Sequence, residues 1–253
     1  MSFIDRDGVR IHYEDDGAGA PILLTHGFTA TMRMWNPQVA ALRDSYRLIR
    51  WDMRGHGHSD APADPALYSH EASVEDMRAV LDACGVERAV IAGLSLGGFM
   101  SMLFHLEHPG RVRALMLLDT GPGYKNDDSR AEWNRYAEAS ARAIEEKGAA
   151  GLIRSNEIRA ENHRTLDGLP HVARGMLVQN DARVINSLPS IAVPSLLMIG
   201  ADDRPFLDGM AYMATKISGS RHEVVAGAGH AVNIDQPERV NAIMREFLDD
   251  LET

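Results

Sequence analysis

The chain has 253 residues, of which 45% are hydrophobic and 25% charged, values typical of a globular protein with one sizeable core. The net charge of -10 argues against nucleic acid as a partner. A mean hydropathy of -0.23, with no run of eighteen apolar residues, argues against a membrane protein. A single cysteine, Cys84, excludes an intrachain disulfide. The first ten residues lack the hydrophobic core of a secretory signal, so we expect a cytoplasmic protein.

Short apolar runs alternate with helix-compatible stretches over the first 120 residues. The strands predicted here are 3–6, 9–14, 21–25, 46–51, 88–93 and 112–118. The predicted helices are 34–44, 74–84 and 96–107, and Ser73 is a candidate cap for the second. Strands separated by helices in this way predict a mostly parallel sheet with helices on both faces.

The pattern changes between Gly121 and Leu188, where only helical stretches are predicted, near 130–147, 149–155 and 171–185. The alternation then returns, with strands at 193–200 and 222–225 and helices at 207–217 and 237–251. We therefore expect an α/β core of roughly eight strands formed by residues 1–120 and 189–253. A helical cap subdomain, residues 121–188, is inserted after the sixth strand.

The most informative motif is Gly93-Leu94-Ser95-Leu96-Gly97, which follows an apolar run and precedes a helical pattern. Small residues two before and two after Ser95 permit a strained strand-to-helix turn that exposes the hydroxyl at the carboxyl end of the strand. The turn also places the amide of Leu96 at a helix N-terminus, where it can hold an oxyanion. The segment resembles the nucleophile elbow of the α/β-hydrolase fold.

A nucleophilic serine needs a base within hydrogen-bond reach and a third group that orients the base. The hydrolase order along the chain is serine, acid, histidine, and His230 lies between the last predicted strand and the last helix, so it is the candidate base. Asp202 and Asp203 follow the strand that ends at Gly200, and neighbouring side chains there point in different directions. The resemblance favours Asp203, because related hydrolases commonly carry the acid three residues after that glycine. Asp202 stays an alternative, and so does Asp119, because some relatives place the acid after the preceding strand.

The resemblance also covers the loop His26-Gly27-Phe28, which matches the His-Gly-hydrophobic form of the family. It implies the amide of Phe28 as a second oxyanion donor beside that of Leu96. The side chain of His26 is expected to be a structural hydrogen bonder, with substrate binding as the alternative.

Residues 52–59, which include Arg54-Gly55-His56-Gly57, resemble a family loop whose polar side chains hold the carboxyl edge of the sheet together. A metal site at His56 and His58 is not expected, because no Asp, Glu or Cys accompanies them at recognisable ligand spacing. No cofactor is expected either.

The resemblance extends over nearly the whole chain and implies a serine hydrolase, since haloalkane dehalogenases and epoxide hydrolases of this fold carry an aspartate where this chain has Ser95. We expect a carboxylic ester hydrolase that acts on small-molecule esters of small to medium acyl chains through an acyl-enzyme. An enol-lactonase, a carbon–carbon bond hydrolase or a perhydrolase with the same three residues stays open, and so does a non-catalytic hydrolase-fold receptor. In relatives a helical cap sets substrate choice, so Tyr124, Trp133 and Tyr136 are candidate substrate contacts, with helix packing as the alternative. The oligomeric state does not follow from the sequence.

Overall fold

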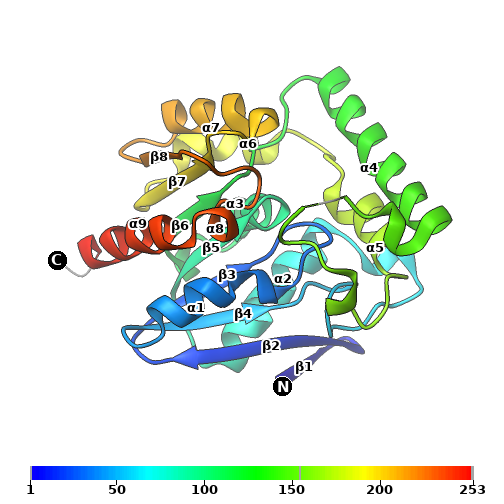
Figure 1. Ribbon diagram of the computed structural model, residues 1–253, viewed down its shortest axis with the longest axis horizontal. Helices are drawn as coiled ribbons and strands as arrows, with labels where there is room; N and C mark the ends of the chain where they lie inside the picture. The colour runs from blue at the N-terminus through cyan, green and yellow to red at the C-terminus, as the bar shows by residue number, and fades with distance from the viewer. Residues whose placement is uncertain (1, 154, 252–253) are drawn as a thin grey trace.

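An eight-stranded sheet forms the centre of the protein in the computed structural model, which describes residues 2–153 and 155–251 (Figure 1). The strand order is β1-β2-β4-β3-β5-β6-β7-β8. Strand β2 pairs antiparallel with β1 and β4, and the other pairs are parallel, so the predicted mostly parallel α/β fold is confirmed. The strands are β1 (Ser2–Arg6), β2 (Val9–Gly17), β3 (Ala20–Thr25), β4 (Tyr46–Trp51), β5 (Ala89–Leu94), β6 (Val112–Leu118), β7 (Ser195–Gly200) and β8 (Arg221–Val225).

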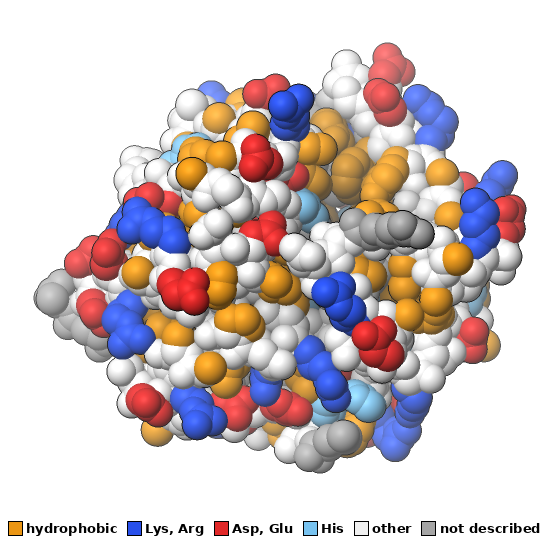
Figure 2. All heavy atoms as spheres, in the orientation of Figure 1, with side chains coloured by type: hydrophobic (Ala, Val, Ile, Leu, Met, Phe, Trp, Pro, Cys, Tyr) orange, Lys and Arg blue, Asp and Glu red, His pale blue; other side chains and the backbone are white. Residues whose placement is uncertain are grey.

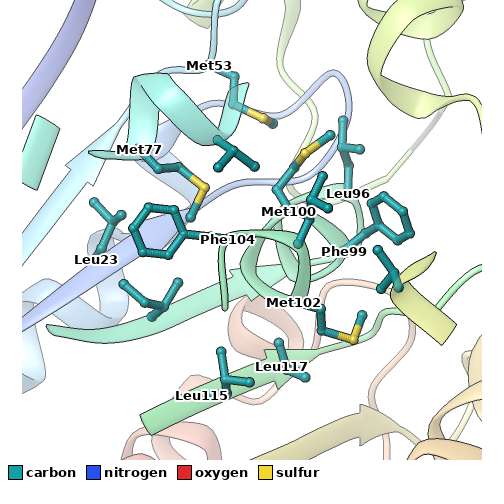
Figure 3. Close-up of a cluster of buried hydrophobic side chains, with 14 of the residues drawn as sticks. Leu23, Met53, Met77, Leu96, Phe99, Met100, Met102, Phe104, Leu115 and Leu117 are labelled. Atoms are coloured by element: carbon teal, nitrogen blue, oxygen red, sulfur yellow. The ribbon is translucent and has the colours of Figure 1, made fainter. Parts of the chain in front are cut away.

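The central strands are buried on both faces, and alternate side chains enter different halves of the core. In β5, Ile91 packs in the cluster under one helical layer, whereas Val90 and Ala92 pack in the cluster under the other. The first layer consists of α2 (His70–Ala83), α3 (Leu96–Glu107) and α7 (Arg204–Lys216). The second layer consists of α1 (Asn36–Leu42), α8 (Val232–Asp235) and α9 (Pro237–Asp250). Figure 3 shows methionine and phenylalanine side chains of α2 and α3 packed against leucines of the strands.

Two helices of the α/β core begin earlier than the sequence predicts. Helix α2 starts at His70 because the side chain of Ser69 accepts a hydrogen bond from the amide of Ala72, while the predicted cap, Ser73, lies buried within the helix. Helix α7 starts at Arg204, and Pro205 is tolerated there because the first-turn amides have no intrahelical partner.

The segment between β6 and β7 contains only helices, turns and loops in its described residues. Its elements are α4 (Asp127–Lys147), η4 (Gly148–Gly151), η5 (Ala160–Asn162), α5 (Leu169–Val172), the π-helical turn η6 (Ala173–Leu177), α6 (Arg183–Ser187) and η7 (Leu188–Ser190). Short 3-10 turns elsewhere are η1 (Met32–Trp35), η2 (Pro65–Leu67) and η3 (Pro109–Arg111). None of the described helices has the length and apolar character required to cross a membrane.

Two predicted helices of this segment were wrong. The helix over 171–185 is interrupted after Leu177, because the Trp133 indole N–H donates to the Leu177 carbonyl at 2.7 Å and the Asn134 side chain accepts from the Gln179 amide at 2.7 Å. The helix over 149–155 is reduced to the turn η4, after which Leu152 is extended; residue 154 lies outside the described residues.

A buried ion pair joins the loop after β4 to helix α2. The guanidinium of Arg54 donates to both carboxylate oxygens of Asp76 at 2.7 Å, and the two side chains are 1% and 0% exposed. Two parallel hydrogen bonds of this kind are strong and directional. They fix residues 52–59 beside the sheet edge where the strands end.

We predict that Asp76→Ala lowers the free energy of unfolding by about 3–5 kcal/mol, because it leaves the Arg54 guanidinium buried without its partner. Urea denaturation followed by circular dichroism measures the change. The control is Asp82→Ala, whose carboxylate is 45% exposed and pairs at the surface with Arg78 and Arg111; we expect it to cost less than about 1 kcal/mol. Equal losses in the two variants would contradict the prediction.

Candidate active site

Ser95 lies at the turn between β5 and α3 with φ 55° and ψ -117°. Positive φ is uncommon outside glycine and marks a strained turn. Although Ser95 occupies the N-cap position of α3, its side chain makes no capping hydrogen bond. The turn is held through the main chain, because the Ser95 amide donates to the Leu118 carbonyl at 3.0 Å and the Thr120 hydroxyl donates to the Ser95 carbonyl at 2.7 Å. Within residues 2–153 and 155–251 no hydrogen bond occupies the Ser95 hydroxyl, which lies at the carboxyl edge of the sheet.

Close packing explains why glycine flanks this turn. A Cβ at Gly93 would lie 2.2 Å from the backbone of Gly97, and a Cβ at Gly97 would lie 2.3 Å from the carbonyl oxygen of Thr25. Real Cβ atoms do not approach backbone atoms so closely, so helix α3 can cross the ends of β5 and β3 only with glycine at both positions.

The imidazole of His230 is held in a fixed orientation after β8. Its Nδ1 lies 2.8 Å from Oδ2 of Asp203, whose side chain is 3% exposed. Its ring stacks on Phe206, with 4.7 Å between centroids. Within the described residues Nε2 makes no hydrogen bond to protein. Burial alone would disfavour the imidazolium. The hydrogen bond that His230 donates to Asp203 and the negative charge of Asp203 outweigh burial and raise the pKa of His230 above its ordinary value.

The other two candidate carboxylates do not contact this imidazole. Asp202 is exposed at the surface. Asp119 is fully buried and accepts hydrogen bonds at 2.9 Å from the amides of Gly200 and Val232. Burial raises the pKa of the Asp119 carboxyl to about 8. Asp119 thus joins the end of β7 to the segment after His230, and only Asp203 of the three candidates contacts the ring.

The predicted oxyanion donors flank Ser95. Leu96 is the first residue of α3, where the amide has no intrahelical partner. The loop that carries Phe28 passes close beside the serine. A Cβ added at Gly27 would lie only 3.4 Å from Cβ of Ser95. In the described part of the chain, neither the Phe28 amide nor the Leu96 amide donates to another protein group. Two amides at one serine can bind the negative oxygen of a tetrahedral adduct.

His26 lies beneath this loop and not in a cavity. The side chain is fully buried, its Nδ1 lies 2.7 Å from the Gly27 carbonyl, and its Nε2 accepts from the Met53 amide at 3.0 Å. Burial lowers the pKa of His26 to about 4, so the ring is neutral. With both nitrogens engaged, His26 supports the loop, and the alternative of substrate binding does not fit its position.

Two cavities meet at Ser95. The Phe99 cavity, of about 260 Å³, is lined by Ser95, Leu96, Phe99, Thr120, Gly121, Pro122, Gly123, Tyr124, Trp133, Leu177, Gln179, Pro205, Phe206, Asp208 and Gly209. The Glu157 cavity, of about 480 Å³, is lined by Gly27, Phe28, Leu94, Ser95, Trp133, Tyr136, Ile153, Ser155, Glu157, Ile158, Leu177, Asp203, Pro205, Phe206 and His230. Figure 2 shows a hollow with hydrophobic side chains between the ends of α4 and α7, the helices that supply Trp133 and Phe206.

Residues 121–188, called the insert below, contain three aromatic residues that were predicted as candidate substrate contacts. All three line these cavities. Trp133 lines both, Tyr124 lines the Phe99 cavity and Tyr136 lines the Glu157 cavity. Trp133 also has the packing role considered as the alternative, since its indole N–H anchors Leu177. Sequence reasoning missed Phe206 and Glu157, because no local motif marks a ring that stacks on a distant histidine or a carboxylate inside a loop.

Among the residues that the structure describes, no group of three or more His, Cys, Asp or Glu side chains is arranged to hold a metal ion. His56 is fully engaged in the loop after β4, where its Nε2 accepts from the Thr29 amide at 3.2 Å.

Comparisons with known proteins agree with this geometry. Residues 20–150 match the family model of the alpha/beta hydrolase fold. A Bacillus subtilis (strain 168) protein provisionally named 2-succinyl-6-hydroxy-2,4-cyclohexadiene-1-carboxylate synthase is 30% identical over 96% of each chain. The 3-oxoadipate enol-lactonase 1 of Acinetobacter baylyi is 29% identical over 96% of this chain and 95% of its own. A thermophilic esterase from Thermogutta terrifontis, with malate bound, superposes over 100% of both chains with a TM-score of 0.85 and 27% identity.

The chain therefore belongs to the α/β-hydrolase family of enzymes. The resemblance inferred from the elbow and the terminal histidine is confirmed. The names of its relatives cover several reactions, so family membership alone leaves the substrate undecided.

We predict that His230 titrates above about 6.5, the ordinary value of histidine, in a histidine NMR titration in which the resonance is assigned with His230→Gln. Asp203→Asn removes the charge that favours the imidazolium and lowers this pKa below that of the wild type. The adjacent Asp202→Asn leaves it unchanged, because that carboxylate is exposed and does not contact the ring. A shift of equal size in both variants would contradict the assignment of Asp203 as the partner.

Proposed function

We propose that the protein is a serine hydrolase that cleaves carboxylic esters of small to medium acyl chains. The observation that carries the proposal is the arrangement at the Glu157 cavity, where Ser95 and His230 face the same space and Asp203 holds the histidine from behind. A serine hydroxyl gains reactivity from a base oriented in this way.

The reaction follows from the atoms available. Ser95 Oγ attacks the ester carbonyl while Nε2 of His230 takes its proton, and the amides of Phe28 and Leu96 bind the oxyanion. The carbon–oxygen bond of the ester then breaks, and His230 returns the proton to the leaving alcohol. Water, activated by the same imidazole, hydrolyses the acyl-enzyme and releases the acid.

The two cavities divide the substrate between them. His230 lines the Glu157 cavity and not the Phe99 cavity, and the leaving alcohol must lie near the imidazole that protonates it. The alcohol part therefore occupies the Glu157 cavity, and the acyl chain occupies the Phe99 cavity between Phe99 and Phe206. A cavity of about 260 Å³ suits a short or medium acyl chain.

The charges that line the cavities favour uncharged esters over anionic substrates. Among the described lining residues the charged groups are Glu157, Asp203 and Asp208, and none is lysine or arginine. Glu157 is only 7% exposed, and one of its oxygens accepts from the Ser155 hydroxyl. A substrate carboxylate would lose its hydration here, and no lining residue in the described part of the chain offers it a cation, which is unfavourable.

We predict that Ser95→Ala reduces the multiple turnover of p-nitrophenyl acetate and p-nitrophenyl butyrate by at least about 1,000-fold, because the nucleophile is lost. Release of p-nitrophenol measures the rate. Ser190→Ala is the matched control, since the Ser190 hydroxyl only donates to the nearby Ser187 carbonyl on the surface, and it retains wild-type activity. If Ser95→Ala were as active as the control, Ser95 would not be the nucleophile.

We also predict that kcat/KM for p-nitrophenyl butyrate exceeds that for mono-p-nitrophenyl succinate by about fivefold, because Asp208, whose exposed side chain lines the Phe99 cavity, repels the added carboxylate by about 1 kcal/mol. Asp208→Asn narrows the ratio between the two substrates, whereas Asp167→Asn, an exposed carboxylate outside both cavities, does not. Equal rates for the two esters in the wild type would rule out this substrate preference.

A further inference from the structure

Three histidines other than His230 surround the loop that follows β3, and none of them lines either cavity. His26 belongs to the loop itself, and His56 comes from the loop after β4. His163 comes from the insert, 134 residues beyond its contact in this loop, and the insert lies over the loop at this point (Figure 1).

Thr29, the residue after Phe28, has φ 61°. A β-branched residue rarely adopts positive φ, so the surrounding structure must hold it there. Two imidazoles do so from opposite ends of the residue. Nε2 of His56 accepts from the Thr29 amide at 3.2 Å, and Nε2 of His163 donates to the Thr29 carbonyl at 2.9 Å.

The second nitrogen of His163 fastens the insert to another loop of the core. Nδ1 accepts from the Gly57 amide at 3.1 Å, and the next amide, that of Arg164, donates to the Gly57 carbonyl at 2.9 Å. The Arg164 side chain also pairs with Asp60 at 2.8 Å. A single imidazole thus connects the insert, the loop after β4 and the loop that carries Phe28.

These contacts require a neutral ring with its hydrogen on Nε2. Nδ1 of His163 is an acceptor, and a second proton there would set two N–H groups against each other. Burial lowers the pKa of His163, and burial together with the nearby His26 lowers that of His56. Asp52 also lies beside this cluster, and its carboxylate is bonded to His12 and to the amides of Met32 and His58.

We infer that His163 is a positioning residue for the oxyanion site: by clamping the Thr29 carbonyl it orients the Phe28 amide and makes that site depend on docking of the insert. The inference rests on the proposed function for the role of the Phe28 amide. His163 touches no substrate; it acts through the loop.

The test compares His163→Phe, which keeps a ring but removes both hydrogen bonds, with His163→Gln. The glutamine amide can still donate to the Thr29 carbonyl and accept from the Gly57 amide. With p-nitrophenyl butyrate we expect His163→Phe to lower kcat about 10- to 100-fold with KM changed less than about threefold, because loss of a whole oxyanion donor costs about 100- to 1,000-fold. His163→Gln stays within about threefold of the wild type.

Affinity for a trifluoromethyl ketone separates positioning from general damage, because its adduct with Ser95 carries an oxyanion. We expect its inhibition constant to rise in His163→Phe by the same factor by which kcat falls. Thr29→Gly in the His163→Phe background restores at least about fivefold of kcat, since glycine adopts positive φ without a clamp. His171→Phe, an insert histidine that packs on Tyr68 outside both cavities, serves as the control and leaves kcat unchanged.

Three kinetic results would overturn the inference: an unchanged kcat in His163→Phe, a His163→Gln variant as slow as His163→Phe, or a fall in kcat with unchanged trifluoromethyl ketone affinity. Amide hydrogen exchange measures the stability of the hydrogen bonds around His163 and needs no substrate. We expect the Thr29 and Gly57 amides to exchange at least about tenfold faster in His163→Phe than in His163→Gln. If the wild type hydrolysed no ester, the proposed function would fail. If the Thr29 and Gly57 amides exchanged at the same rate in His163→Phe and His163→Gln, the clamp itself would be ruled out, whatever the activity.

Discussion

The close crossing of helix α3 over the ends of β5 and β3 is the constraint on which the site depends. Gly93 and Gly97 leave no room for a side chain, and the chain can enter the helix only through a residue with positive φ. That residue is Ser95, and its strained backbone is held by two hydrogen bonds, from its amide to the Leu118 carbonyl of β6 and from the Thr120 hydroxyl to its carbonyl. The same crossing places the amide of Leu96, the first residue of α3, beside Ser95. The proposed nucleophile and one proposed oxyanion donor are therefore positioned by the same helix–sheet contact.

Two helix caps are left unused at this edge of the sheet. Ser95 and Asp203 occupy the N-cap positions of α3 and α7, yet neither side chain caps its helix. A good N-cap contributes about 0.5–2 kcal/mol, and elsewhere the chain uses one, as Ser69 and Asn126 show. The unused caps leave the hydroxyl free and direct the carboxylate to His230. Stability is given up at the two positions where the proposed chemistry needs an unoccupied oxygen.

The insert contributes to the site in two physical ways. Trp133 and Leu177, joined by a hydrogen bond, form a wall shared by both cavities, so the insert defines the space around Ser95. His163, in the same segment, donates to the Thr29 carbonyl in the loop that carries Phe28. Binding space and backbone geometry are therefore both coupled to the docking of one segment on the core.

Local patterns determined much of this protein. The alternation of strands and helices and the turn at Ser95 depend on short-range backbone preferences, which a sequence displays directly, and the order of residues that the family resemblance implies pointed to His230. The family resemblance favoured Asp203, but only the tertiary structure shows that Asp203, and not Asp202 or Asp119, contacts His230, because side-chain direction in a loop and contacts across 27 residues have no local signature. The interrupted helix near Leu177 and the clamp at Thr29 were likewise decided by side chains from distant segments, 44 and 134 residues away. The two cavities at Ser95 also depend on the tertiary structure, since their walls form only where the insert and the core meet.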